Sequence, residues 1–204
     1  LKFDLAFDHL AAKEMDSKNQ VAGASNPYSR RLENITAGLD NYRGLSFDFK
    51  VYLAPEVNAF AMADGTVRVY SGLLDAMPDD QGLAVIGHEI AHVLADHSNE
   101  RLSQSQIANA GLQLTNIALG SSEYAQYRGA TMAALGLGVQ YGVLMPYGRT
   151  QESEADIVGL ELMAKSGFDP NQSVDLWKNM AKASGGAQPP ELLSTHPSHG
   201  TRIQ

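Results

Sequence analysis

The sequence predicts an α+β fold that is mostly helical, with a small three-stranded sheet packed beside a central buried helix. Three short runs within residues 47–70 alternate apolar and polar residues, which is the period of β-strands. Most of the remaining chain repeats its apolar residues at the spacing of an amphipathic helix. The stretch 81–97 is apolar around most of its circumference, which places it at the centre of the fold.

The first strand is predicted over residues 47–53, whose odd-numbered residues are apolar. The second run begins at Asn58 and ends at Ala63, and Asp64-Gly65 joins it to a third run at 66–70, which predicts a hairpin. We interpret the second run as a candidate edge strand, to which an extended peptide could add. A covered sheet edge is the equally weighted alternative.

Helices are predicted on both sides of these strands. The first 45 residues are helix-like, broken at Asn26-Pro27 and resumed from Arg31 to Arg43. After residue 97, helices are expected over 98–119, parts of 123–145, 151–165 and 172–182. The apolar run 131–145 is shorter than the ~20 residues that a membrane span needs, so we expect a buried or interfacial helix there.

The composition excludes several kinds of site. The 204 residues include 44% apolar and 19% charged side chains, as in ordinary globular proteins. A formal charge of −8 argues against nucleic acid as a partner, because phosphate backbones need clustered Lys and Arg. The chain has no cysteine, so any metal must bind through His, Asp or Glu.

The central helix carries the motif His88-Glu89-Ile90-Ala91-His92. Residues four apart share a helix face, so both imidazoles can bind one metal ion. Glu89 projects about 100° away from His88, off the metal but within reach of a water on it. Two histidines and a glutamate on so apolar a helix are costly unless they are paired or metal-bound. A chance match is the alternative, and it need not fall on a core helix.

A second acidic pair begins the predicted helix at 151–165. Glu152 and Asp156 are four residues apart and share a face, whereas Glu154 points elsewhere. One carboxylate can bind the metal while the other accepts the second N–H of a ligating histidine, which fixes that imidazole's orientation. The alternative is that acidic residues simply favour the first turn of a helix.

The motifs together resemble the gluzincin-type zinc endopeptidases that include the CAAX prenyl protease, HtpX, BepA and LoiP. The likeness is closest to the soluble periplasmic members. It covers most of residues 45–204 in the family's order. The matching segments are Asn58-Ala-Phe-Ala, Tyr70-Ser-Gly-Leu-Leu74, Gly87-His-Glu-Ile-Ala-His-Val93, Glu152-Ser-Glu-Ala-Asp156 and Ser194-Thr-His-Pro-Ser-His-Gly-Thr-Arg202.

The resemblance implies a zincin-like metalloprotease fold and one peptidase domain over residues 1–204. Residues 45–204 form its catalytic core, and 1–44 form a helical segment of unassigned role. It implies one Zn²⁺ per chain, with His88, His92 and Glu152 as its ligands.

The resemblance also implies roles for residues that do not bind the metal throughout the reaction. Glu89 corresponds to the general base, and Asp156 corresponds to the aspartate that supports a ligating histidine. His196 corresponds to a histidine that either steadies the oxyanion or binds zinc as a plug. Arg202 corresponds to an arginine near the site.

The function implied is zinc-dependent hydrolysis of peptide bonds in unfolded or misassembled envelope proteins. We expect a periplasmic or membrane-associated protein, and membrane association only through a removed N-terminal signal or lipid anchor. One alternative is a zinc-containing chaperone or assembly factor whose peptidase site is normally plugged. A weaker alternative is a structural zinc site, which would have four protein ligands.

Overall fold

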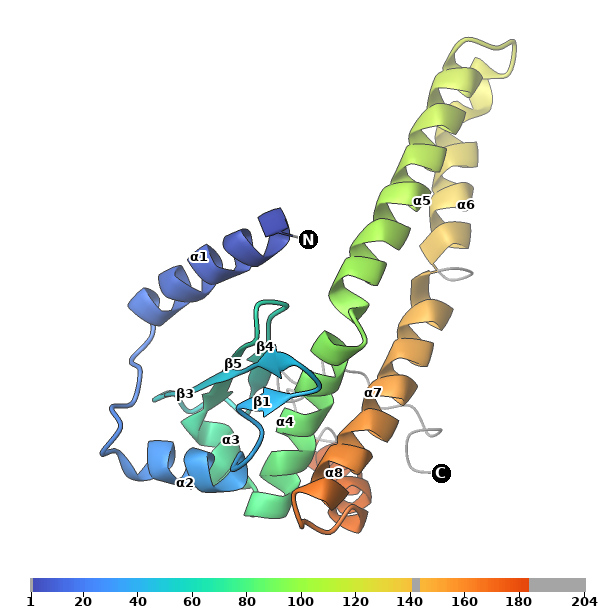
Figure 1. Ribbon diagram of the computed structural model, residues 1–204. Coiled ribbons are helices and arrows are strands. Elements are labelled where there is room, and N and C mark those ends of the chain that lie inside the picture. Colours follow the sequence, from blue (N-terminus) through green and yellow to red (C-terminus); the bar gives the residue numbers. More distant parts are fainter. Residues whose placement is uncertain (1, 141–143, 184–204) are drawn as a thin grey trace. The chain divides into compact units, whose positions relative to one another are not determined.

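The structure is a computed structural model that describes residues 2–140 and 144–183 (Figure 1). The chain divides into two compact units. The first unit combines the chain up to Ala95 with the chain from Ser153 onward, and the second unit is Asp96–Glu152. The expectation of one peptidase domain with an N-terminal segment over residues 1–44 stays a prediction.

The sheet of the first unit has the predicted three strands. They are β3 (Asp48–Tyr52), β4 (Ala59–Ala61) and β5 (Thr66–Tyr70), in the order β3-β5-β4. β3 runs parallel to β5, while β4 pairs with β5 in the antiparallel hairpin that Asp64-Gly65 predicted. At Gly65 φ is +89°, and a Cβ atom there would meet the carbonyl oxygen of Ser46, so the turn requires glycine.

Helices pack on the apolar face of this sheet (Figure 1). They are α2 (Pro27–Ile35), α3 (Ser71–Ala76) and α4 (Asp79–Leu94), and α8 (Asn171–Ala183) contacts α4 in turn. The shared core consists of apolar side chains from the strands and helices, including Leu32, Ile35, Val51, Val67, Val69, Leu73, Leu83, Ile86, Ile90, Leu162 and Met163. The prediction of a mostly helical α+β fold, with a small sheet beside the central helix, is confirmed.

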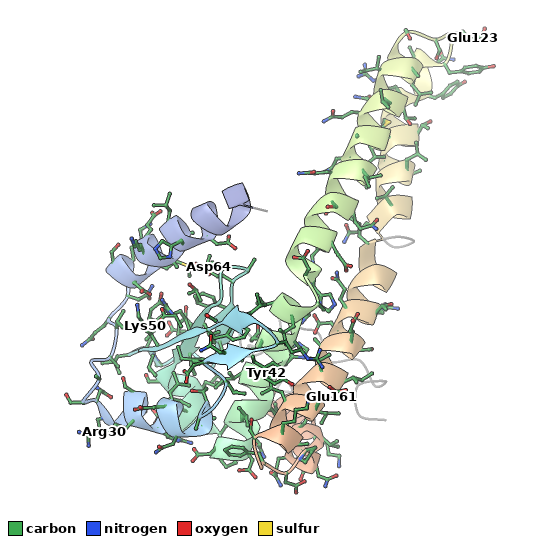
Figure 2. All side chains as sticks on the ribbon, viewed as in Figure 1. Arg30, Tyr42, Lys50, Asp64, Glu123 and Glu161 are labelled. Carbon is green, nitrogen blue, oxygen red and sulfur yellow. The ribbon has the colours of Figure 1, made fainter. Side chains whose placement is uncertain are left out.

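The helix expected to continue to Arg43 ends at Ile35, so this prediction was wrong. Gly38 and Gly44 have φ of +83° and +84°, values that a right-handed helix does not allow. The segment instead forms a two-stranded hairpin of β1 (Asn41–Tyr42) and β2 (Leu45–Ser46). Figure 2 labels Tyr42, whose hydroxyl accepts a hydrogen bond from Lys165 at 3.1 Å.

The other face of the sheet carries a buried ion pair that ties down α1 (Lys2–Lys18). Arg68 on β5 is 2% exposed, and its Nε donates to Asp16 Oδ1 of α1 at 2.8 Å. Tyr52 donates its hydroxyl proton to the same oxygen at 2.7 Å. Burial raises the pKa of Asp16, but hydrogen bonds from Arg68 and Tyr52 outweigh it and hold that pKa well below its usual range. The alternating pattern did not reveal this second buried face.

The second unit is a helical hairpin of α5 (His97–Gly120) and α6 (Arg128–Val139), with a short 3₁₀ turn, η1 (Ala125–Tyr127), between them. The long helix α7 (Met145–Lys165) begins in this unit and continues into the first. α6 covers part of the run 131–145, where a buried or interfacial helix was expected, and none of its residues is buried. None of the described helices has the length and apolarity to cross a membrane.

Candidate metal centre

The central helix α4 positions the HExxH motif by burying almost its whole length. Every residue from Gln81 to His92 is buried, as the apolar pattern predicted. Asp79 and Asp80 occupy the first turn, where carboxylates favour the helix dipole. Pro78 is the N-cap residue, and no side chain caps the helix.

His88 and His92 face each other across one turn of α4. Their Nε2 atoms lie 3.1 Å apart, and their rings meet edge to face at 84°. His88 Nδ1 lies 3.0 Å from Asp156 Oδ1 on α7. A carboxylate only accepts hydrogen bonds, so His88 carries its proton on Nδ1 and turns the lone pair of Nε2 toward His92. In metal centres a carboxylate commonly holds a ligating histidine in this way.

Glu152 completes a group of three ligand atoms. One atom each from His88, His92 and Glu152 lies within 4.8 Å of the others, and all three residues are buried. Glu152 is one turn before Asp156 on the continuous helix α7. The sequence predicted that these two carboxylates share a face, and Asp156 is the one that contacts His88.

The donor set fits a zinc ion. Two nitrogen ligands of a tetrahedral zinc ion, each at ~2.0–2.1 Å, lie about 3.3 Å apart, close to the separation of the two histidine nitrogens. Imidazole and carboxylate are both ordinary zinc ligands. Among the described residues three donors converge, which is the number in catalytic sites, whereas structural sites use four.

A close helix crossing brings α7 to the motif. A Cβ atom on Gly159 of α7 would lie 3.2 Å from the backbone nitrogen of His88. A Cβ atom on Gly87 would lie 3.4 Å from the carbonyl oxygen of Gly159. Because both helices have glycine at the crossing, their backbones approach closely and Asp156, one turn earlier, reaches His88. Sequence reasoning missed Gly159, since an isolated helical glycine gives no signal of its partner.

Gln151 is a second residue that sequence reasoning missed. It precedes Glu152 and is only 2% exposed. Its side-chain amide donates to Glu100 Oε2 at 3.2 Å and to the carbonyl oxygen of His97 at 3.3 Å. These bonds hold the turn of α7 that carries Glu152, and no sequence pattern distinguishes such a glutamine from an exposed one.

Two residues implied by the resemblance cannot be placed. His196 and Arg202, in the segment Ser194-Thr-His-Pro-Ser-His-Gly-Thr-Arg202, lie outside the described residues. Their roles therefore stay predictions, including the alternative between an oxyanion donor and a plug at His196.

Comparison with known proteins identifies the family. Residues 29–204 match the model of Peptidase family M48. Metalloprotease YcaL of Escherichia coli is 35% identical over 192 residues, which are 94% of this chain and 73% of YcaL. Metalloprotease LoiP of Escherichia coli is 35% identical over 195 residues, 95% of this chain and 75% of LoiP. Human mitochondrial metalloendopeptidase OMA1 is 32% identical over 160 residues, 74% of this chain and 30% of OMA1. With its histidine and glutamate cluster on α4 and α7, this chain is a metalloendopeptidase and belongs to peptidase family M48.

Proposed function

We propose that this chain is a zinc-dependent endopeptidase of the bacterial envelope, with His88, His92 and Glu152 as zinc ligands. The observation that supports it best is the convergence of these three buried donors, together with the carboxylate of Asp156 on the Nδ1 side of His88. A neutral imidazole held in one tautomer binds zinc through its other nitrogen.

A zinc ion held by these residues would polarise the scissile carbonyl and acidify the attacking water. Glu89 follows His88 on α4 and is buried beside it, so its carboxylate is our candidate for the general base. In that role it accepts a proton from the attacking water and later delivers it to the leaving amine. Asp156 acts through His88 and holds its orientation during both steps.

The edge strand β4 is our candidate for aligning the peptide. It is an outer strand of the sheet and contacts α4, the helix that carries the motif. Phe60 and Ala61 are partly exposed there. An extended substrate that pairs with this edge would make backbone hydrogen bonds independent of its sequence, as cleavage of unfolded proteins requires. The resemblance to periplasmic peptidases supports a role in envelope protein quality control.

The substitution Glu89→Gln tests the mechanism. We expect the metal to stay bound while cleavage of casein falls by about 10²–10⁴-fold, the contribution of a general base. Glu154→Gln is the matched control, because Glu154 is exposed on α7 and points away from Asp156. Unchanged cleavage by Glu89→Gln would contradict the role of Glu89.

A chaperone whose peptidase site is plugged is the alternative, and the substitution His196→Ala tests it. The two roles considered for His196 predict opposite effects of this substitution on cleavage. If His196 blocks the metal, His196→Ala should cleave casein faster than the unmodified chain. If His196 stabilises the oxyanion, the same substitution should slow cleavage.

A further inference from the structure

A hollow lies away from the metal cluster, along the outer edge of β3. Its volume is about 680 Å³, within the range of ligand-binding pockets. Phe47, Phe49 and Val51 line it from one face of the strand, and Asp48 and Lys50 line it from the other face. Because residues of both faces contribute, the hollow lies against the strand's edge.

The backbone of β3 shows which groups face this hollow. Asp48 donates its N–H to the carbonyl oxygen of Gly65, at the start of β5, at 2.9 Å. Backbone groups alternate sides along a strand, so the odd-numbered residues of β3 turn their N–H and C=O groups away from β5. These residues therefore present hydrogen-bonding groups to the hollow.

This outer edge is paired at its two ends. Ala22 donates its N–H to the carbonyl oxygen of Val51 at 2.9 Å, and Phe47 donates its N–H to that of Asp40 at 2.8 Å. Between these bonds, the N–H and C=O of Phe49 have no hydrogen-bond partner among the described residues. The open stretch is thus a short gap in an otherwise paired sheet edge.

The lining opposite the strand includes small residues and two acidic side chains. Small residues line it on the chain opposite the strand, namely Ala22, Ala24, Ala37 and Gly38. Glu33 and Asp40 also line it, are exposed, and have no ion pair among the described residues. Lys50, labelled in Figure 2 below α1, is already paired with Asp16 at 3.1 Å. The acidic rim, Glu33 and Asp40, therefore favours a basic ligand.

We propose that this gap binds an extended peptide segment that adds as a strand to β3, with Lys or Arg side chains beside Glu33 and Asp40. Ala22 and Asp40 already pair with the two ends of this edge, so the peptide pairs through the residue opposite Phe49, with a basic residue on either side of it. β3 and β4 are the two outer strands of the sheet, so this site is separate from the edge proposed for the scissile peptide.

Binding is tested with two peptide probes on the Glu89→Gln protein, which removes cleavage from the measurement. One probe is fluorescein-labelled Lys-Val-Thr-Val-Lys, and the other replaces both lysines by glutamate. We expect the lysine probe to bind about tenfold more tightly, since two exposed ion pairs are replaced by like charges in the other. Equal affinity for the two probes would overturn the assignment of the acidic rim.

The substitution Phe49→Pro tests strand addition directly. Proline removes the outward N–H of residue 49 without removing a bond to β5. Phe49→Ala is the matched control, because it loses the same ring but keeps that N–H. We expect Phe49→Pro to bind the lysine probe about tenfold more weakly than Phe49→Ala, the effect of one lost hydrogen bond. Equal affinities in two folded variants would overturn strand addition.

The charged rim has its own pair of variants. The double substitution Glu33→Gln and Asp40→Asn should remove the preference for the lysine probe. Glu123→Gln, at an exposed position between α5 and η1 (Figure 2), should leave that preference unchanged. A preference that survives the double substitution would contradict the rim's role.

Amide hydrogen exchange decides the location if Phe49→Pro does not fold. We expect the lysine probe to slow exchange at Phe49 in the Glu89→Gln protein, because strand addition gives its N–H a partner. Slower exchange confined to Ala59–Ala61 of β4 would overturn the proposal and place the probe at the other sheet edge.

Discussion

Two buried clusters of the first unit contain the same kind of contact, a carboxylate against a buried nitrogen. Arg68 meets Asp16 at 2.8 Å on one face of the sheet, and His88 meets Asp156 at 3.0 Å where α4 and α7 cross. The guanidinium is a permanent cation, and its three nitrogens all donate, to Asp16, to Asp48 and to the backbone. In the other cluster, the second nitrogen of His88 faces an imidazole nitrogen.

This difference separates a structural cluster from a binding site. The Arg68 cluster holds opposite charges in contact, and its hydrogen bonds connect α1 to two strands. The His88 cluster gathers two imidazoles and a carboxylate in a buried place, which is favourable once a cation binds them. We therefore expect substitutions in the first cluster to change stability, and substitutions in the second to change metal binding and activity.

The largest effect on stability is expected for Asp16→Ala. It leaves Arg68 buried with only part of its charge balanced, which costs about 3–5 kcal/mol of unfolding free energy. Chemical denaturation measures this loss, and the metal content should not change. Glu14→Ala is the matched control on the same helix, because its ion pair with Lys18 is exposed and should not affect stability.

The advantage of the unmodified chain over Asp16→Ala also depends on pH. The pKa of Asp16 is lower in the folded chain than its value of about 3.9 in an unfolded one, so its contribution is complete above about pH 5. The contribution is lost as the pH falls from about 4 toward the lower folded pKa. A difference between the two proteins that stays constant down to pH 2 would contradict the ion pair.

The substitution Asp156→Asn should change metal binding more than stability, whereas Asp16→Ala should change stability alone. It weakens the support of His88, and we expect metal affinity to fall about 10–100-fold. Competition with a chromogenic chelator measures the affinity, and denaturation of the metal-free protein should show a smaller change than Asp16→Ala does. Asp175→Asn, at an exposed position on α8, is the control. Unchanged metal affinity in Asp156→Asn would show that Asp156 does not support metal binding, and would contradict the difference between the two clusters.

The smallest effect is expected at the helix crossing. Gly159→Ala places a methyl group against the backbone of α4 at His88 and should cost about 1–3 kcal/mol, with weaker metal binding. Gly82→Ala is the control on α4, because its added methyl group meets nothing within 4 Å and alanine favours the helix by about 0.5–1 kcal/mol. Equal stability of the two variants would show that the close contact of Gly159 with α4 does not stabilise the site.

The sequence predicted those parts of the site that depend on local spacing. The apolar pattern of α4 predicted its burial, and the four-residue spacing of His88 and His92 predicted that their side chains meet. The alternating runs and Asp64-Gly65 predicted the β4–β5 hairpin. In these cases local backbone geometry alone fixes which residues share a face.

The features that the sequence did not predict depend on contacts between distant segments. A single arginine in a strand is usually exposed, and Arg68 is buried only because α1 covers that face. Gly159 gains its importance from Gly87 on another helix. The helix predicted from Arg31 to Arg43 ends at Ile35, because Gly38 and Gly44 adopt positive φ, which a right-handed helix does not allow.

We expect the α4–α7 cluster to bind one metal ion through His88, His92 and Glu152. Elemental analysis after extensive dialysis tests it most directly, on the unmodified chain, on His88→Ala and on Glu152→Gln. We predict close to one zinc ion per unmodified chain and almost none in either variant. Equal metal content in all three proteins would contradict the site.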